Sequence, residues 1–286
     1  LDAASAVFNW AGYTGDETLI YELEQTGTSL KLVVTSAGDV WIWQGAEGVT
    51  WSDTNTGAMW GIEGSTDTAA EKNLIFNSTG AGTVTLSGAV NPASITVNNA
   101  AGSDYVFVSD DTGKIAQGTL TKRGEGKLVL NLDNTGWNGD ISVQQGELVA
   151  QVANSLGSGA ITVTDGVLTL ATADVQPGMG MINLQGGRLN LASGSFATAF
   201  TADNMTWTGG SMTLGEEVAA TVAKALANGK AVELADGSVL TVSGANDNSA
   251  LNLNASGSGT VFVGLGTSYG ANVLNMSTEF QGILSV

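Results

Sequence analysis

The chain has 286 residues, of which 9 are basic and 27 acidic, so its formal net charge is −18, and it contains neither cysteine nor histidine. A surface of this charge repels polyanions, which excludes nucleic acid and anionic membrane as direct partners of this segment. The missing residue types also exclude a Ser-His-Asp triad, a Cys-His pair and a histidine-based zinc site.

The rest of the composition favours short strands joined by tight turns. There are 40 glycines but only 2 prolines, and 43% of the residues are hydrophobic. Many glycines without prolines are typical of turns between strands, not of a disordered chain. A chain without cysteine is suited to export through an oxidising periplasm, although it suits the cytosol equally. No signal peptide opens the chain at Leu1 and no apolar run is long enough to span a membrane, so we expect that any targeting segment has been removed.

Residues 1–72 differ from the rest because they hold five of the seven tryptophans. We interpret this region as an N-terminal cap with the first coils of the repeats that follow, which occupy residues 73–286. The functional alternative is a sugar-binding platform, because indole faces stack on apolar sugar faces. Large aromatic side chains are usually buried, which favours the cap. The tryptophans concerned are Trp10, Trp41, Trp43, Trp51 and Trp60, and the last four are the candidate ligand-binding residues.

The clearest acidic cluster surrounds the predicted strand YVFV and consists of Asp104, Asp110 and Asp111. Paired carboxyl groups are the catalytic groups of glycoside hydrolysis, so the cluster keeps an enzyme hypothesis open. We favour a structural interpretation, in which these residues cap the ends of the strand. Calcium-binding nonapeptides and EF-hand loops are absent from the sequence, and we predict no metal site, no cofactor and no catalytic residue.

Three segments of similar pattern follow one another from Ile141, Ile161 and Ile182. Each is a short alternating strand, a polar pair that includes glycine, and a second alternating strand. Two apolar marker positions, five residues apart, recur at spacings of 20 and 21 residues. The same offset returns further along the chain. The marker pairs are Val143 and Leu148, Val163 and Leu168, Leu184 and Leu189, Trp207 and Met212, and Leu234 and Val239.

This repeat predicts an all-β solenoid. Alternation of period two puts apolar side chains on one face of each strand and polar ones on the other. A single unit cannot bury its apolar face, but units stacked about 4.8 Å apart close a continuous interior. The repeat length is that of one solenoid coil. We therefore predict a right-handed parallel β-helix of about nine to eleven coils, with Leu148, Leu168, Leu189 and Met212 in one interior column.

One segment, from Gly215 to Lys230, has a helical pattern. Val218, Val222 and Leu226 recur at every fourth residue, and Gly229 can end a helix. We predict a short helical insertion that bridges one coil with extra length and carries no chemistry.

A longer unit runs from Thr119 to Ala150, and parts of it return at the C-terminus. Its W-x-G-x-I-S-V portion, from Trp137, is matched by F-x-G-x-L-S-V from Phe280, and GEGKLVLNL is matched by GSGTVFVGL. The sequence stops part-way through this second unit. We therefore expect that the last repeat is truncated and that more chain follows.

This unit, LTKRGEGKLVLNLDNTGWNGDISVQQGELVA, resembles the autotransporter-associated β-strand repeat. That family has a Leu-Thr-Lys-x-Gly-x-Gly opening, a Leu-x-Leu strand, an Asn-x-aromatic-x-Gly turn and a Gly-x-Leu close. One departure is Trp137, where the family more often has tyrosine. Weaker similarity extends over most of residues 41–190 and the last 30 residues. The resemblance implies a β-helical passenger exported to the surface of a Gram-negative cell, with a membrane β-barrel downstream, but it implies no single activity.

The sequence thus predicts a non-catalytic extracellular module of an autotransporter passenger. It would act as an adhesin or scaffold that contacts host or neighbouring-cell material, with glycans as the preferred ligand. It would be anchored at the outer membrane through the downstream barrel, or released. The alternatives are a carbohydrate-active β-helical enzyme that uses paired Asp and Glu residues and a passive stalk.

Overall fold

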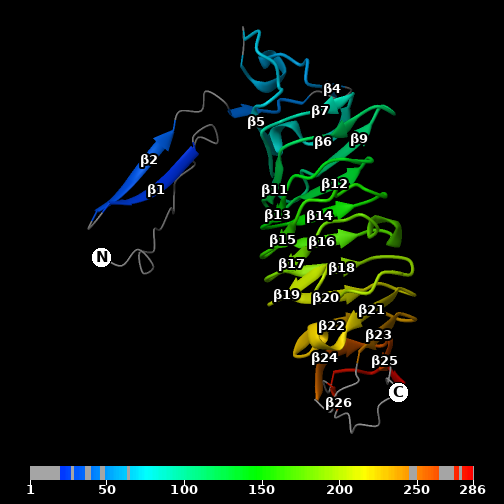
Figure 1. Cartoon of the computed structure of the whole chain (residues 1–286). Helices are drawn as coiled ribbons and strands as arrows, with labels where there is room; N and C mark the ends of the chain where they lie inside the picture. Colours follow the sequence, from blue (N-terminus) through cyan, green and yellow to red (C-terminus); the bar gives the residue numbers. More distant parts are fainter. Residues whose placement is uncertain are drawn as a thin grey trace.

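The chain forms a right-handed parallel β-helix of about nine turns, as the repeat predicts (Figure 1). The coils are stacked along one axis, with the N-terminal strands of the solenoid at one end and the C-terminal strands at the other. This is a computed structural model, and it describes residues 20–26, 29–35, 40–45, 49–62, 65–244, 250–263, 274–276 and 279–285.

Three parallel sheets form the solenoid: sheet II runs along its length, sheet I covers its N-terminal part and sheet III its C-terminal part. Within each sheet, strands pair with those of adjacent coils. Sheet I contains β3 (Val40–Ile42), β5 (Asn73–Asn77), β8 (Ser94–Asn98), β11 (Thr119–Arg123), β13 (Ile141–Val143), β15 (Ile161–Val163), β17 (Ile182–Leu184) and β19 (Met205–Trp207). Sheet II contains β4 (Thr50–Trp51), β6 (Gly82–Leu86), β9 (Tyr105–Ser109), β12 (Lys127–Asn131), β14 (Glu147–Ala150), β16 (Val167–Leu170), β18 (Arg188–Leu191), β20 (Ser211–Leu214), β22 (Lys230–Leu234), β24 (Leu251–Gly257) and β26 (Leu274–Met276). Sheet III contains β21 (Ala219–Ala223), β23 (Val239–Ser243), β25 (Thr260–Val263) and β27 (Ile283–Ser285).

The other elements are short. An antiparallel hairpin of β1 (Ile20–Thr26) and β2 (Ser29–Thr35) forms a sheet of its own, and β7 (Ala89–Val90) pairs in parallel with β10 (Lys114–Ile115). Single 3₁₀ turns cover Gly57–Trp60, Ser78–Gly80 and Ala173–Val175. The one α-helix of the described residues, α1, covers Lys224–Ala227, and no helix among those residues is long and apolar enough to cross a membrane.

The core consists of columns of inward side chains, one from each coil. The predicted column is confirmed, because Leu148, Leu168, Leu189 and Met212 are consecutive register partners in sheet II. It extends to further coils in both directions, and every member is at most 2% exposed. The full column is Tyr105, Leu128, Leu148, Leu168, Leu189, Met212, Val232 and Ala255.

Alternation decides which side chains enter these columns. In sheet I, Ile141 and Val143 are buried, whereas Ser142 between them faces outward. Ser142 pairs with Thr162, and Thr162 pairs with Asn183, so the outer face of the sheet carries a ladder of small polar side chains. Because the side-chain period of a strand is two, this pattern fixes the register of every coil.

The predicted helix is correct in existence but wrong in extent. Residues 219–223 form β21, and only the four residues of α1 are helical. Val218 and Val222 recur four residues apart, but four is also a multiple of the strand period, and Ala220 between them is buried too. The apolar pattern is therefore that of a strand that pairs with β23. The helix follows in the part of the coil where earlier coils have a strand of sheet I.

The last predicted marker pair is assigned to the wrong corner. Leu234 pairs with Leu214 in sheet II, and Val239 pairs with Ala219 in sheet III. The pair therefore spans the corner between sheets II and III, whereas the earlier pairs span the corner between sheets I and II. Likewise, β25 and β27 belong to sheet III, although their sequences match segments of sheets II and I. Similar local patterns can serve either corner because both join two alternating strands.

The core column predicts how stability depends on position. Replacing Leu168 with alanine is expected to lower the free energy of unfolding by about 2–5 kcal/mol, because coils above and below keep the cavity from collapsing. Replacing exposed Thr164 with alanine is expected to change it by no more than about 0.5 kcal/mol. Urea unfolding of both variants, followed by circular dichroism, measures the two values. Equal losses at both positions would contradict the assignment of inward and outward faces.

Candidate functional site

The four tryptophans proposed for ligand binding are buried. Trp41 is 2% exposed, Trp43 and Trp60 are 1% exposed, and Trp51 is fully covered. Trp10 lies outside the described residues. Stacking on a sugar requires an accessible ring face, which none of the four offers. The structure therefore favours the cap interpretation of these residues.

Aromatic packing explains why these side chains are internal. Trp51 contacts Phe76 and Phe107 at ring-centroid distances of 5.3 and 5.7 Å, and Trp43 contacts Trp60 at 5.0 Å. Several of these pairs are edge-to-face, the favourable geometry for aromatic rings. The cluster fills the interior of the first coils of the solenoid.

The acidic residues around β9 hold backbone groups instead of forming a catalytic pair. Asp104 and Asp110 lie at opposite ends of the strand. Asp104 accepts a hydrogen bond from the backbone N–H of Lys127 at 2.8 Å, and Asp110 accepts bonds from the N–H and hydroxyl of Thr112 at 3.0 and 2.7 Å. Hydrogen bonds from the side chains of Ser87 and Thr112 lower the pKa of Asp110 to about 2. Asp111 occupies the turn itself, with a φ of 82°.

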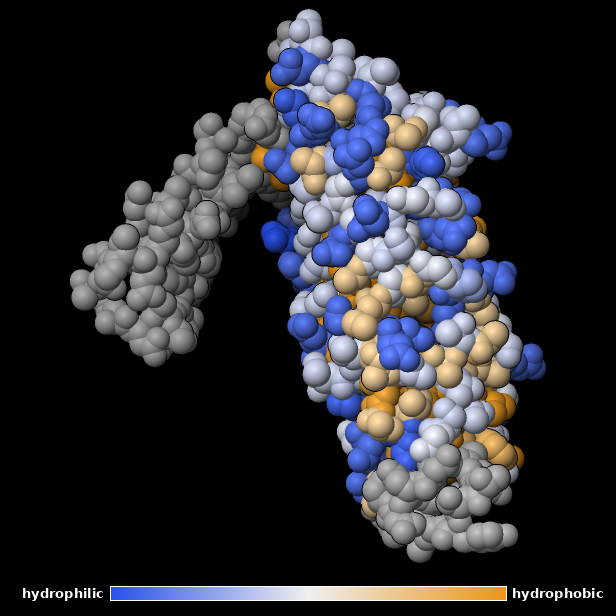
Figure 2. All heavy atoms as spheres, viewed as in Figure 1, coloured by the Kyte–Doolittle hydropathy of each residue, from blue (hydrophilic) through white to orange (hydrophobic). Residues whose placement is uncertain are grey.

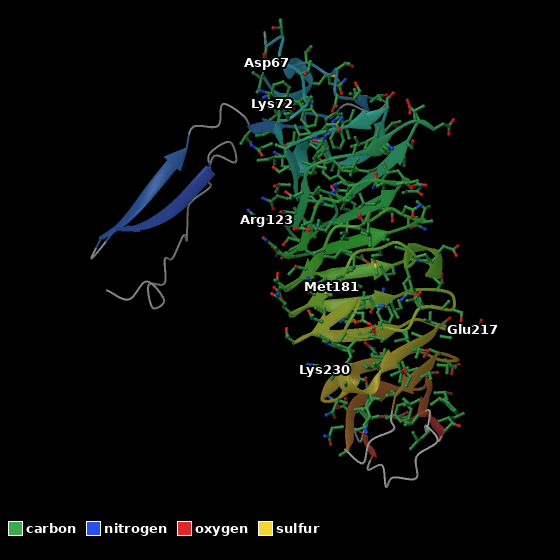
Figure 3. All side chains as sticks on the ribbon, in the orientation of Figure 1. Asp67, Lys72, Arg123, Met181, Glu217 and Lys230 are labelled. Atoms are coloured by element: carbon green, nitrogen blue, oxygen red, sulfur yellow. The ribbon has the colours of Figure 1, made fainter. Side chains whose placement is uncertain are left out.

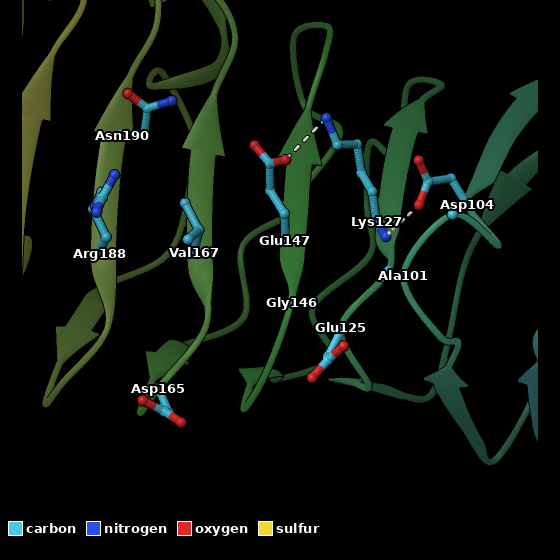
Figure 4. A pocket seen from close by; sticks show the side chains of 12 residues that line it. Ala101, Asp104, Glu125, Lys127, Gly146, Glu147, Asp165, Val167, Arg188 and Asn190 are labelled. Carbon is cyan, nitrogen blue, oxygen red and sulfur yellow. Dashed lines mark hydrogen bonds and ion pairs between the residues drawn. The ribbon is translucent and has the colours of Figure 1, made fainter.

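A hollow of about 670 Å³ lies on the outer face of sheet II (Figure 4). It runs across five successive coils, from the turn before β9 to β18. Polar and charged side chains dominate its lining, and no aromatic side chain belongs to it. The lining residues are Ala101, Gly102, Asp104, Glu125, Gly126, Lys127, Gly146, Glu147, Asp165, Val167, Arg188 and Asn190. This hollow is the best candidate for a functional site among the described residues.

A chain of polar contacts crosses the floor of the hollow from coil to coil. The Lys127 ammonium lies 2.9 Å from one carboxylate oxygen of Glu147, and the other oxygen of Glu147 accepts the hydroxyl of Thr169 at 2.6 Å. Asn190 donates to the same hydroxyl at 3.3 Å. Both oxygens of Glu147 are thus engaged by neighbours, so this carboxylate is a poor candidate for a general acid or nucleophile.

Four exposed charged residues line the hollow: Asp104, one of whose oxygens accepts the N–H of Lys127, and three others. Glu125 and Asp165 lie in the corner turns between sheets I and II, and Arg188 lies on β18 (Figure 4). These side chains can donate and accept hydrogen bonds to a polar ligand that follows the solenoid axis. The described residues contain no group of three or more acidic side chains that is placed to hold a metal ion.

Sequence reasoning missed this site, although the repeats contained the signal for it. Each residue directly before an aligned leucine faces outward, and these residues are register partners in sheet II. Aligning the repeats on Leu148, Leu168 and Leu189 would have placed Glu147, Val167 and Arg188 in one ladder.

Close to the hollow, Lys122 is a buried basic residue. It occupies an inward position of sheet I between Val97 and Val143, and its side chain is fully buried. Its neighbour Arg123 projects from the outer edge of the solenoid (Figure 3). Burial lowers the pKa of Lys122 to about 8, and the Asp104 carboxylate partly opposes that shift. A cation inside an apolar column is costly unless it is fully hydrogen-bonded.

Comparison with protein-family models, curated proteins and solved structures found no match for this chain. The resemblance to the autotransporter-associated repeat therefore rests on the motif itself, from Leu120 to Ala150.

The lowered pKa of Lys122 predicts a rise in stability at alkaline pH. Between pH 8 and 10.5 the unfolded chain holds a proton on this lysine that the folded chain has released, so folding becomes more favourable as pH increases. The free energy of unfolding is expected to rise by about 2 kcal/mol between pH 7.5 and 9.5 from this residue.

Urea unfolding of the native chain and of Lys122→Met at both pH values measures this difference. The variant is expected to lack the rise, because it has no group to titrate at this position. Burial also raises the pKa of Tyr105, but that tyrosine is present in both proteins and so cancels in the comparison. A rise of equal size in the variant would show that other groups cause it.

Proposed function

We propose that this chain is a non-catalytic scaffold segment of an autotransporter-type passenger, displayed on the surface of a Gram-negative cell. The observation that carries this proposal is where the motif residues lie in the fold. Lys122 and Trp137, from the opening and the turn of the motif, are both fully buried, and the indole N–H of Trp137 donates to the carbonyl of Gly118 at 2.8 Å. These motif residues therefore stabilise the coil. A rod that projects from a cell surface requires coils stabilised in this way.

Of the described residues, the two carboxyl groups whose pKa values are displaced, Asp110 and Asp133, do not suit a general acid. A glycosidase needs a general acid whose pKa is raised. The displaced carboxyl pKa values of the described residues, those of Asp110 and Asp133, are both lowered, chiefly by hydrogen bonds from neighbouring side chains. Such groups are ionised at neutral pH and cannot donate a proton to a leaving group.

The charge of the surface suits a crowded cell exterior. On the face shown in Figure 2, hydrophilic side chains are spread along the length of the solenoid and not gathered in one patch. With a net charge of −18, neighbouring copies repel one another. This repulsion favours a rod that does not associate with its own copies. Its outer surfaces are then accessible to molecules of the host or of neighbouring cells.

Surface display is the first test of this proposal. Fused upstream of an autotransporter translocator, the chain is expected to react with antibody on intact Gram-negative cells and to be removed by added protease. The same fusion without the translocator is the control and is expected to stay inside the cell. Retention of the complete fusion in the periplasm, with the translocator inserted, would contradict the proposal.

Binding of a glycan is a second candidate, and the hollow on sheet II is the observation that favours it. Its exposed groups, Glu125, Asp165 and Arg188, can hydrogen-bond to the hydroxyl groups of a polysaccharide that extends over several coils. Without an aromatic platform, affinity at a single site would be weak, and useful adhesion would depend on many displayed copies.

A glycan array probed with a clustered form of the chain tests this candidate. Binding is expected to fall at least about tenfold in the double variant Glu125→Gln, Asp165→Asn if each lost charge removes one charge-assisted hydrogen bond. The matched control is Asp203→Asn, Glu216→Gln, which changes the same charges at exposed positions outside the hollow. Equal binding by both double variants would exclude the hollow, and release of shorter saccharides would favour the enzyme.

A further inference from the structure

The corner between sheets I and II changes its length along the solenoid. We count the corner from the last paired inward residue of sheet I to the outward position of sheet II that directly precedes the column of Leu128. The coil of β11 then has four corner residues, 123–126, and the next coil has three, 144–146. The three coils after that also have three: 164–166, 185–187 and 208–210. The coil of β8 has six, 98–103. Stacked coils of unequal corner length cannot pair all of their backbone groups.

One inward residue before these corners is not apolar. The four coils with three-residue corners have apolar residues there, namely Val143, Val163, Leu184 and Trp207. The coil of β5, with the four-residue corner 77–80, has Phe76, and the coil of β8 has Val97. The coil of β11, whose four-residue corner stacks on a three-residue corner of the next coil, has Lys122 at the same position of the column. The lysine therefore coincides with the point at which one extra residue must be accommodated.

The contacts of Lys122 explain this coincidence. The next coil donates its backbone N–H groups to the carbonyls of Lys122 and Gly126, at 2.9 and 3.2 Å, which leaves the carbonyls between them without a ladder partner. The ammonium group of Lys122 donates to two of these, Arg123 and Gly124, the latter at 2.8 Å, and reaches the carbonyl of Gln145 at 3.4 Å. The buried cation thus supplies a hydrogen-bond donor to two corner carbonyls that the inter-coil ladder leaves unpaired.

The six-residue corner has an equivalent device. Asn99 is fully buried, and its amide donates to the carbonyls of Ser103 and Lys127 at 2.7 and 3.0 Å. The steps in corner length from six residues to four and from four to three therefore each carry a buried side-chain donor aimed at corner or strand carbonyls.

We infer that Lys122 is an internal positioning residue, which allows the solenoid to carry a four-residue corner and thereby holds Glu125 at the edge of the hollow. Glu125 lines the hollow from this corner, and the glycines on either side of it, Gly124 and Gly126, have no room for a side chain against Asn99. Space is equally restricted in the next corner, where a Cβ at Gly146 would lie 2.8 Å from the Lys122 ammonium. This inference is independent of what the hollow binds.

A compensating deletion tests the inference. Deletion of Glu125 leaves the corner Arg-Gly-Gly, which has the length and glycine pattern of the corners 185–187 and 208–210. Lys122→Met alone is expected to lower the melting temperature by at least about 5 °C, because buried carbonyls lose their donor. Deletion of Glu125 alone is expected to lower it as well, because the ammonium loses its acceptors. The combined variant is expected to recover most of the lost melting temperature, because it contains neither the ammonium without acceptors nor the longer corner whose carbonyls need a donor.

Lys127→Met is the matched control, since Lys127 lies in the same coil with its side chain 42% exposed, and its melting temperature is expected to change by no more than about 2 °C. If Lys122→Met does not fold but the combined variant does, the rescue is complete and the inference stands. Losses that add in the combined variant, or a combined variant that does not fold, would overturn it. Native stability of Lys122→Met alone would also overturn it.

Discussion

The structure depends on one constraint: no coil of this chain can bury its apolar residues without the coils above and below it. Each strand of the three sheets contributes inward side chains, and these are covered only when the neighbouring coil supplies its register partners. The column through Leu128 and Leu148 consists of such partners, all nearly inaccessible to solvent. Inter-coil backbone pairing and side-chain burial are therefore satisfied by the same stacking distance.

This constraint separates the roles of the two faces of each strand. Each inner side chain must pack against its neighbours or form hydrogen bonds with them. Trp51 in the first coils packs against an aromatic ring, and Lys122 donates hydrogen bonds to backbone carbonyls. The outer positions are free to vary, and a ligand surface must be built from them and from the corners. The hollow along sheet II has this origin, since Glu125 and Asp165 come from corners and Arg188 from an outer position of β18.

Sequence periodicity predicted the parallel β-helix and its central column because a strand period of two and a coil length of about 20 residues are both visible in the repeats. It failed at Val218 and Val222, where a spacing of four fits both a helix and a strand, and at Leu234, where two corners share one pattern. Aromatic composition could not tell a core from a platform, so the burial of Trp51 and Trp60 came only from the structure. The hollow was not predicted because the repeats were aligned on their inward residues, whereas Glu147, Val167 and Arg188 are the outward residues directly before them.

Distances between spin labels along one outer ladder test the central claim, the stacking of one coil on the next, most directly. Thr96, Thr121, Ser142, Thr162, Asn183 and Thr206 are consecutive outward partners on sheet I, and the chain has no cysteine to interfere with labelling. With one label fixed at position 206, the separation is expected to increase by about 4.8 Å for each coil towards position 96. Separations that do not increase in this linear order would contradict the stacked solenoid.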